Sequence, residues 1–291
     1  MSTSVKNSPM WAFLSLFING VLIVAVILLL YRQQKMAASF RDFTTPAGTN
    51  LSINSPTSQL QLGKRHQLSY QEWLNVLKKE ADIIAQKRPQ DLNILVGDSL
   101  SLWFPTELLP VNQTWLNQGI SGESSSGLLK RLNLFDKTQP ESIFVMIGIN
   151  DLIRGANDGK ILENYQQILR YLRKTHPNSQ INIQSILPHG GEGATWEGKD
   201  KLLAIANSRI QKINQQLEAI ALQEKVRYLD LYPLFATKEG NLRPDLTTDG
   251  LHLSRQGYLV WSSALQIYQE MAITEENPQD GQQKIPSNQG Q

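Results

Sequence analysis

Short apolar runs alternate with longer amphipathic segments through the middle of this chain, and that alternation limits the possible folds more than any other feature. Runs rich in Val, Ile and Leu predict five strands, at residues 94–96, 114–117, 143–147, 181–186 and 226–229. Because these runs are apolar on both faces and helices lie between them, the pattern is typical of a parallel sheet covered by helices on each side. We expect an α/β fold, a three-layer α/β/α domain with a mostly parallel five-stranded sheet.

Four longer helices are predicted around this sheet. The folded domain should begin at a helix in which Ser69 and Glu72 have the spacing of a capping box, and this helix should end just before Pro89. A second helix is expected over about 159–176, and the last from a Ser254 cap to about Met271. Another helix, third in chain order, is predicted from apolar residues that share one face: Leu202, Ala206, Ile210, Ile213, Leu217 and Ile220.

The N-terminal region contains an uncharged run of 21 residues, from Trp11 to Tyr31, dense in Leu, Ile and Val. As a helix it would extend roughly 31 Å, against a hydrocarbon core of about 30 Å. A buried core helix rarely has so much uninterrupted apolar surface. A cleaved signal peptide has a shorter core, of about 7–15 residues, and an Ala-x-Ala step that is missing after Tyr31. We therefore expect an uncleaved transmembrane anchor.

This anchor divides the rest of the chain. Residues 1–10 are a short tail, 32–68 a Thr-, Ser-, Asn- and Pro-rich flexible stalk, 69–273 the folded domain, and 274–291 a disordered tail rich in Gln, Asn, Pro and Gly. Lys6 and the α-amino group lie on one side of the anchor and Arg32, Lys35 and Arg41 on the other, which favours a cytoplasmic domain by only about one charge. Anchors of this kind commonly export the domain on their C-terminal side, so we expect a single-pass membrane protein with an extracytoplasmic domain.

Overall composition excludes several classes of function. The formal net charge is only +2 and no basic stripe is present, so nothing favours a nucleic-acid partner. The absence of cysteine rules out disulfides, thiolate metal ligands and a Cys nucleophile. Two-metal phosphoesterases need more histidine ligands than the four scattered ones here, which disfavours a metallohydrolase. We expect neither a metal nor an organic cofactor.

Polar segments follow several of the predicted strands, at the strand ends where open parallel sheets collect functional groups. Ser99 follows the first strand through Gly97, and a strand that ends this way delivers a hydroxyl to the rim of the sheet. Asn150 follows the third strand, while Asp249 and His252 precede the last helix. Taken singly, each segment also fits an ordinary turn or helix cap.

Four segments that occur together in a fixed order favour a catalytic site over a set of unrelated turns and helix caps. They are Gly97-Asp98-Ser99-Leu100, Asn117-Gln118-Gly119-Ile120-Ser121-Gly122, Gly148-Ile149-Asn150-Asp151 and Asp249-Gly250-Leu251-His252-Leu253. Together they resemble the blocks of the GDSL, or SGNH, family of serine hydrolases, and all four name-giving residue types are present. The resemblance covers about residues 90–270. It implies a flavodoxin-like fold and an esterase or lipase-like activity that needs no cofactor.

The resemblance assigns roles that the chemistry supports. Ser99 would attack a carbonyl carbon while His252 takes its proton and returns it to the leaving alcohol, and Asp249 would hold the His252 ring in the required tautomer. The oxyanion would be bound by the backbone N–H groups of Ser99 and Gly119 and by the side-chain amide of Asn150. Glycine suits position 119 because a side chain there would block the acyl oxygen.

The substrate pocket is defined by fewer signals. His189 opens a glycine-rich loop after the fourth strand, so we expect it to line the pocket, with a mobile surface position as the alternative. Trp103 is expected either to wall the acyl pocket or to pack in the core. Asp98 and Asp151, beside the catalytic positions, are interpreted as structural residues that bond loop N–H groups.

These expectations converge on a membrane-anchored serine hydrolase. It would cleave acyl or acetyl esters of a small molecule, a lipid or a polysaccharide through an acyl-enzyme intermediate. An O-acyltransferase with a saccharide acceptor would use the same residues and remains an alternative, because the two differ only in the acceptor that the pocket admits. A non-catalytic membrane-tethered binding module is disfavoured by the complete set of catalytic residues.

Overall fold

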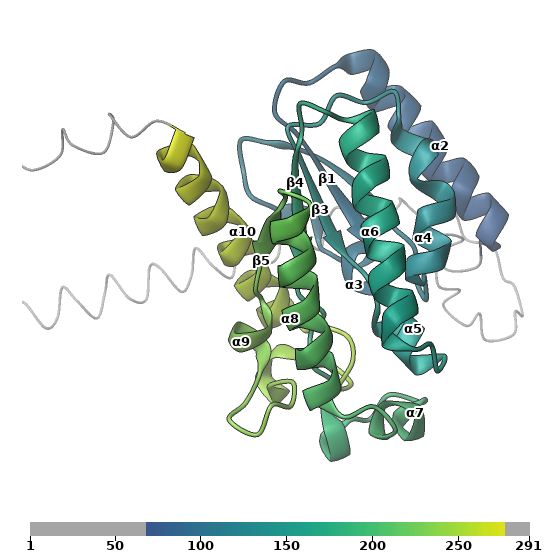
Figure 1. Ribbon diagram of the computed structural model, residues 1–291, viewed down its shortest axis with the longest axis vertical. Coiled ribbons are helices and arrows are strands. Elements are labelled where there is room, and N and C mark those ends of the chain that lie inside the picture. Colours follow the sequence, from purple (N-terminus) through teal and green to yellow (C-terminus); the bar gives the residue numbers. More distant parts are fainter. Residues whose placement is uncertain (1–67, 277–291) are drawn as a thin grey trace, which may run out of the picture. The chain divides into compact units, whose positions relative to one another are not determined.

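The computed structural model describes residues 68–276, which form a parallel sheet with helices on both faces (Figure 1). Its five strands are β1 (Leu92–Gly97), β2 (Thr114–Gly119), β3 (Ser142–Met146), β4 (Gln180–Gln184) and β5 (Arg227–Leu229). All neighbouring pairs are parallel, in the order β2-β1-β3-β4-β5. The predicted α/β/α architecture is confirmed, and the strand order is the flavodoxin-like one.

Different helices cover the two faces because successive residues of a strand point to opposite sides. Ile94 and Val96 of β1 pack in a core with α2 (Tyr70–Lys87), α4 (Ser125–Arg131), α6 (Asp158–Thr175) and α8 (Asn207–Gln223). Leu95, between them, packs on the other face with α9 (Tyr232–Phe235) and α10 (Arg255–Glu276). On the first face α6 lies between α4 and α8 (Figure 1).

The predicted helix boundaries are confirmed where they rest on capping residues. Ser69 N–H donates to the Glu72 carboxylate at 2.7 Å while Glu72 N–H donates to Ser69 Oγ at 3.4 Å, so the capping box starts α2 as expected. The helix ends at Arg88, whose φ is 49°, before Pro89. Ser254 Oγ accepts the Gly257 N–H at 3.2 Å at the start of α10, which continues past its expected end to Glu276.

One predicted helix is two helices in the structure. Leu202 belongs to α7 (Lys199–Leu203), Ala206 is exposed, and the remaining apolar residues of the pattern lie on α8. In a continuous helix Arg209 N–H would donate to the Ile205 carbonyl; instead it donates to Ala206 at 2.8 Å, while the Ile205 carbonyl lies 2.6 Å from His189 Nε2. A tertiary contact therefore breaks the helix that local periodicity predicts.

Several short elements join these units. They are α3 (Ser99–Leu102), α5 (Ile149–Ile153) and the 3₁₀ turns η2 (Thr106–Leu108), η3 (Leu132–Phe135), η4 (Gly191–Gly193) and η5 (Pro244–Leu246). Of these, α3 and α5 directly follow β1 and β3 and carry two of the predicted site residues.

The predicted anchor at 11–31 lies outside the described residues, as do the stalk at 32–68 except for residue 68 and the tail at 274–291 except for 274–276. Within residues 68–276, no helix combines the length and the apolar character needed to cross a bilayer.

Candidate active site

The carboxyl ends of three neighbouring strands lie level with one another. Gly97 at the end of β1 pairs with Gly119 of β2 and with Met146 of β3. The loops after these strands therefore leave the sheet together, at the edge where functional groups of such folds gather. Position 97 requires glycine, because a Cβ there would lie 2.2 Å from the Met146 carbonyl oxygen.

Ser99 is the first residue of α3, and its neighbour Asp98 caps that helix. Asp98 Oδ1 accepts the Leu100 N–H at 3.0 Å. Burial raises the pKa of Asp98 to about 7, with the nearby carboxylates of Asp151 and Glu123 adding to the rise and its hydrogen bonds opposing it. A buried carboxyl engaged in capping is structural, as predicted, and this leaves Ser99 as the candidate nucleophile of the turn.

Asp249 and His252 form a hydrogen-bonded pair in the loop before α10. Asp249 Oδ2 lies 2.7 Å from His252 Nδ1, and Oδ1 accepts the N–H groups of Leu251 at 2.9 Å and His252 at 2.7 Å. Partial burial would raise the pKa of Asp249, but these hydrogen bonds outweigh it and hold the pKa below its ordinary value. With Nδ1 donating to the carboxylate, Nε2 is left to accept a proton.

Gly250 makes the turn between this pair possible. Its φ is 88°, a conformation that side chains disfavour, and a Cβ there would lie 2.5 Å from that of Ala194. The Asp249 carbonyl also accepts the N–H groups of Thr195 and Trp196, at 2.8 and 2.9 Å. The glycine-rich loop after β4 therefore supports the Asp249–His252 turn.

Trp103 connects His252 to the helix of Ser99. The rings of Trp103 and His252 have centroids 4.3 Å apart, and the backbone N–H of Trp103 donates to the Ser99 carbonyl at 3.0 Å. Trp103 is 40% exposed, so the core position considered for it is wrong, whereas its neighbour Phe104 is buried. Among the hydrogen bonds of residues 68–276 there is none between the Ser99 and His252 side chains; such bonds often tighten only when substrate binds.

The geometry does not support the oxyanion role predicted for Gly119. Its N–H already donates to Asn117 Oδ1 at 2.9 Å, and Asn117 Nδ2 donates to the Ser101 carbonyl. A Cβ at Gly119 would lie 2.4 Å from the backbone nitrogen of Leu102. Close packing of α3 on β2, and not access of a substrate, requires glycine here.

Gly122, further along the same segment, has the properties expected of an oxyanion donor. It is half-buried and its φ is 73°. Its carbonyl accepts a hydrogen bond from Arg154, which caps the helix that carries Asn150. Within residues 68–276 its N–H donates to no protein acceptor. The sequence contains both glycines in one segment, and only their backbone hydrogen bonds distinguish them.

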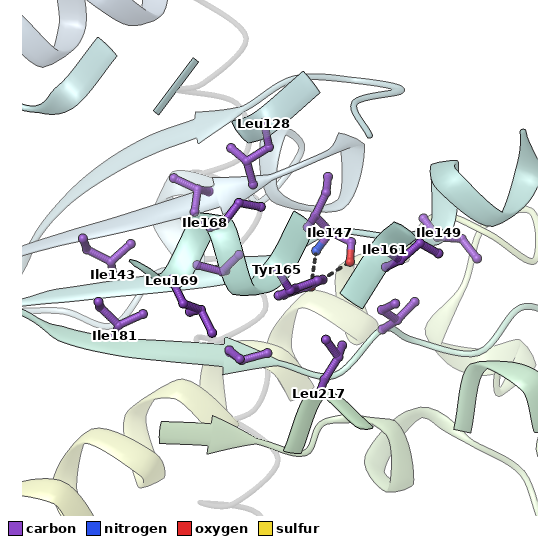
Figure 2. Packing of buried hydrophobic residues seen from close by; sticks show 14 of the residues in the cluster. Leu128, Ile143, Ile147, Ile149, Ile161, Tyr165, Ile168, Leu169, Ile181 and Leu217 are labelled. Atoms are coloured by element: carbon purple, nitrogen blue, oxygen red, sulfur yellow. Dashed lines mark hydrogen bonds between the residues drawn. The ribbon is translucent and has the colours of Figure 1, made fainter. Parts of the chain in front are cut away.

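Asn150 lies on α5 and is held from two sides. Tyr165 of α6 donates its hydroxyl proton to the Ile147 carbonyl at 2.7 Å and accepts the Ile147 N–H at 3.1 Å, which fixes the chain just after β3 (Figure 2). Asn150 Nδ2 donates to Asp98 Oδ2 at 3.3 Å. This bond joins the segment after β3 to the segment that carries Ser99, the candidate nucleophile.

Asp151 is structural, as predicted. Its carboxylate accepts the Ser125 N–H at 2.8 Å and the Ser125 hydroxyl at 2.6 Å, and Ser125 Oγ accepts the Asn164 amide at 2.8 Å. The start of α4 is therefore bonded to both α5 and α6.

A buried ion pair that sequence reasoning missed lies beneath the site. Arg131 Nε is 2.9 Å from Glu123 Oε2, and both side chains are buried. The same guanidinium donates to the carbonyls of Gln118 at 2.8 Å and Gly97 at 3.1 Å. It therefore connects the ends of β1 and β2 just before the catalytic segments. No local pattern marks the role of Arg131, because the two carbonyls that it binds lie on β1 and β2 and come together only through the sheet.

His189 does not line a substrate pocket and is not a mobile surface residue, so both predictions for it are wrong. Its side chain is buried; Nε2 lies 2.6 Å from the Ile205 carbonyl, and Nδ1 accepts the Gly191 N–H at 3.1 Å. Burial lowers its pKa, with the hydrogen bond to Ile205 opposing. Asn207 completes the contact by bonding the backbone N–H and carbonyl of His189. His189 therefore orders the loop that supports the Asp249–His252 turn.

Comparison with known proteins agrees with this geometry. The model of the GDSL-like lipase/acylhydrolase family matches residues 96–260. The chain belongs to this family. The match includes all the predicted catalytic positions and begins after α2.

Several curated proteins are similar to this GDSL-like hydrolase. An N-acylneuraminate cytidylyltransferase of Streptococcus agalactiae is 27% identical over 175 residues, which are 60% of this chain and 38% of that protein. A platelet-activating factor acetylhydrolase IB subunit alpha1 of Bos taurus is 24% identical over 200 residues, 65% of this chain and 79% of that one. The chain thus spans well under half the length of the cytidylyltransferase.

Solved structures of other proteins are also similar to this chain. A Streptococcus pneumonia protein named for platelet activating factor superposes with a TM-score of 0.57 at 28% identity, covering 68% of this chain and 96% of that one. A GDSL-like lipase of Bacteroides thetaiotaomicron superposes with a TM-score of 0.56 at 20% identity, covering 69% of this chain and 99% of that one. The second likeness shows a shared fold.

Proposed function

We propose that this member of the family cleaves carboxylic esters through an acyl-enzyme intermediate. Ser99 Oγ attacks the carbonyl carbon, His252 Nε2 takes the hydroxyl proton and passes it to the leaving alcohol, and ionised Asp249 stabilises the imidazolium. Water, activated by the same imidazole, then releases the carboxylic acid and restores Ser99. The observation that carries this proposal is the 2.7 Å Asp249–His252 pair, whose ring packs on Trp103, one helical turn from Ser99.

For the oxyanion we propose the N–H groups of Ser99 and Gly122 and the Asn150 amide as donors. Asn150 has two amide protons, of which one is used by Asp98, so the other is available to substrate. Loss of one such donor lowers kcat by about 10²–10³. Replacing the amide of Gly122 by an ester linkage should therefore lower kcat, whereas the same replacement at Gly119 should change kcat little. The reverse result would restore Gly119 to the role.

The direct test is covalent labelling of the full chain with a fluorophosphonate, together with hydrolysis of p-nitrophenyl acetate. We expect the wild-type protein to be labelled at Ser99. In Ser99→Ala both the labelling and the ester hydrolysis should be lost. Wild-type protein that neither labels nor hydrolyses the ester would refute the proposal, and full activity in His252→Ala would refute the role of that residue. Release of p-nitrophenol only when an acceptor sugar is present, with the acyl group recovered on the sugar, would instead establish an acyltransferase.

We also propose that residues 11–31 anchor the protein in a membrane as a single pass, with the hydrolase domain outside the cytoplasm. The support is the uncharged run of 21 residues, long enough to cross a bilayer as a helix. Protease added to intact cells should digest the domain. Digestion only after lysis of the inner membrane would overturn this placement.

A further inference from the structure

A groove of about 500 Å³ runs alongside the edge strand β2, next to the proposed catalytic residues. Helix α2 contributes Trp73, Leu77 and Ile83 to its lining, the segment after Ser99 contributes Leu102 and Trp103, and β2 contributes Trp115. The volume is within the range of small-molecule sites, about 300–1,000 Å³. Most of the side chains that these elements contribute are apolar.

The groove and the candidate catalytic site share the side chain of Trp103. This side chain lines the groove and also packs on the His252 ring at 4.3 Å between centroids. Ile83 and Trp103 are 41% and 40% exposed, although both are large and apolar. Large apolar side chains that line a groove and stay open to water mark a surface that binds something apolar.

The lining chemistry restricts the occupant. Among the described residues that line the groove none is Lys or Arg, and Glu80 contributes a carboxylate, so these residues offer a phosphate or carboxylate group no charge partner. The wall formed by α2 precedes residue 96, where the family match begins.

We propose that this groove binds an extended hydrocarbon chain of the ester substrate and makes the enzyme selective for medium- and long-chain esters. The proposal rests on the proposed esterase function. The chain can belong to the acyl group or to the alcohol, and both present the same chemistry to the groove. Each buried methylene should raise kcat/KM about fourfold until the groove is full.

Two ester series show whether the groove binds the chain of the acyl group or that of the alcohol. The full chain, in one fixed lipid preparation so that partitioning is equal for all variants, is assayed with p-nitrophenyl esters from acetate to octanoate and with methyl to octyl acetates. We expect kcat/KM to rise with length in one series. Equal kcat/KM across both series would overturn the proposal.

Variants at exposed groove positions test the location. Ile83→Glu places a charge in the groove and Thr106→Trp fills it, and each should abolish the chain-length dependence while p-nitrophenyl acetate hydrolysis stays at the wild-type rate. The control Leu222→Glu makes a similar change at an 82% exposed position on α8 and should keep the full dependence. An unchanged chain-length profile in both groove variants would refute the assignment.

A binding measurement separates failure of the groove from failure of the esterase. Because Trp73, Trp103 and Trp115 line the groove, 1-octanol should change tryptophan fluorescence saturably in Ser99→Ala, and this change should disappear in Ser99→Ala with Ile83→Glu. A saturable signal with no hydrolysis by wild-type protein would keep the groove and refute the esterase. Hydrolysis by wild-type protein with no saturable fluorescence signal would keep the esterase and refute the groove.

Discussion

Replacing Tyr165 by Phe tests how the core of the domain positions Asn150. The phenol is fully buried and bonds both the carbonyl and the N–H of Ile147. Phe keeps the ring but leaves both backbone groups without this partner, and each unpaired buried group costs about 1–3 kcal/mol. We expect a loss of about 2–4 kcal/mol in the free energy of unfolding, in the lower part of the summed range because the hydroxyl no longer has to be desolvated.

The same change should reach the active site. Ile147 lies three residues before Asn150, so a displaced strand end moves the proposed amide donor, and kcat should fall about tenfold to a hundredfold. Urea unfolding followed by tryptophan fluorescence gives the stability, and p-nitrophenyl acetate hydrolysis gives kcat. Tyr171→Phe on the same helix is the matched control, since its hydroxyl bonds Asp136 at the surface. If the two variants were equally stable, the reasoning about Ile147 would be wrong.

Buried or paired charges give three further predictions. The raised pKa of Asp98, about 7, means that the folded state holds a proton that the unfolded state has lost above about pH 4, so its stabilising contribution is lost as pH rises through 7. The free energy of unfolding of the wild type, measured with urea relative to Asp98→Asn, should therefore fall by on the order of 3 kcal/mol between pH 5 and pH 8. A difference between the two proteins that does not change with pH would contradict the argument that Asp98 is a buried acid. Arg131→Met should cost about 3–5 kcal/mol in unfolding free energy because the buried Glu123 carboxylate loses its cation and, among residues 68–276, keeps only hydrogen bonds from Tyr70 and Ser124, and adding Glu123→Met should recover part of that loss. Asp249→Asn should lower kcat by about 10³–10⁴ with little change in stability, because an amide does not enforce the tautomer; near-normal turnover would remove Asp249 from the mechanism.

The strands were predictable because a strand buried on both faces needs a continuous apolar run, and such a run is visible within a few residues. The start of α2 was predictable for the same reason, since the capping box of Ser69 and Glu72 is local. The division between α7 and α8 was not predictable, because it depends on the Ile205 carbonyl bonding to His189 from another part of the chain. Apolar periodicity continues across that division and carries no information about the contact.

At the candidate site the sequence by itself determined which residue types are available and in what order: a serine after β1, an asparagine after β3, and an Asp-His pair before α10. Only the tertiary structure decided how they are used. It occupied the Gly119 N–H with Asn117, left that of Gly122 without a protein acceptor among residues 68–276, buried His189 under a loop, and brought Trp103 against His252. The physical reason is that residue type is a local property, whereas hydrogen-bond partners and burial are set by the elements that the sheet brings together.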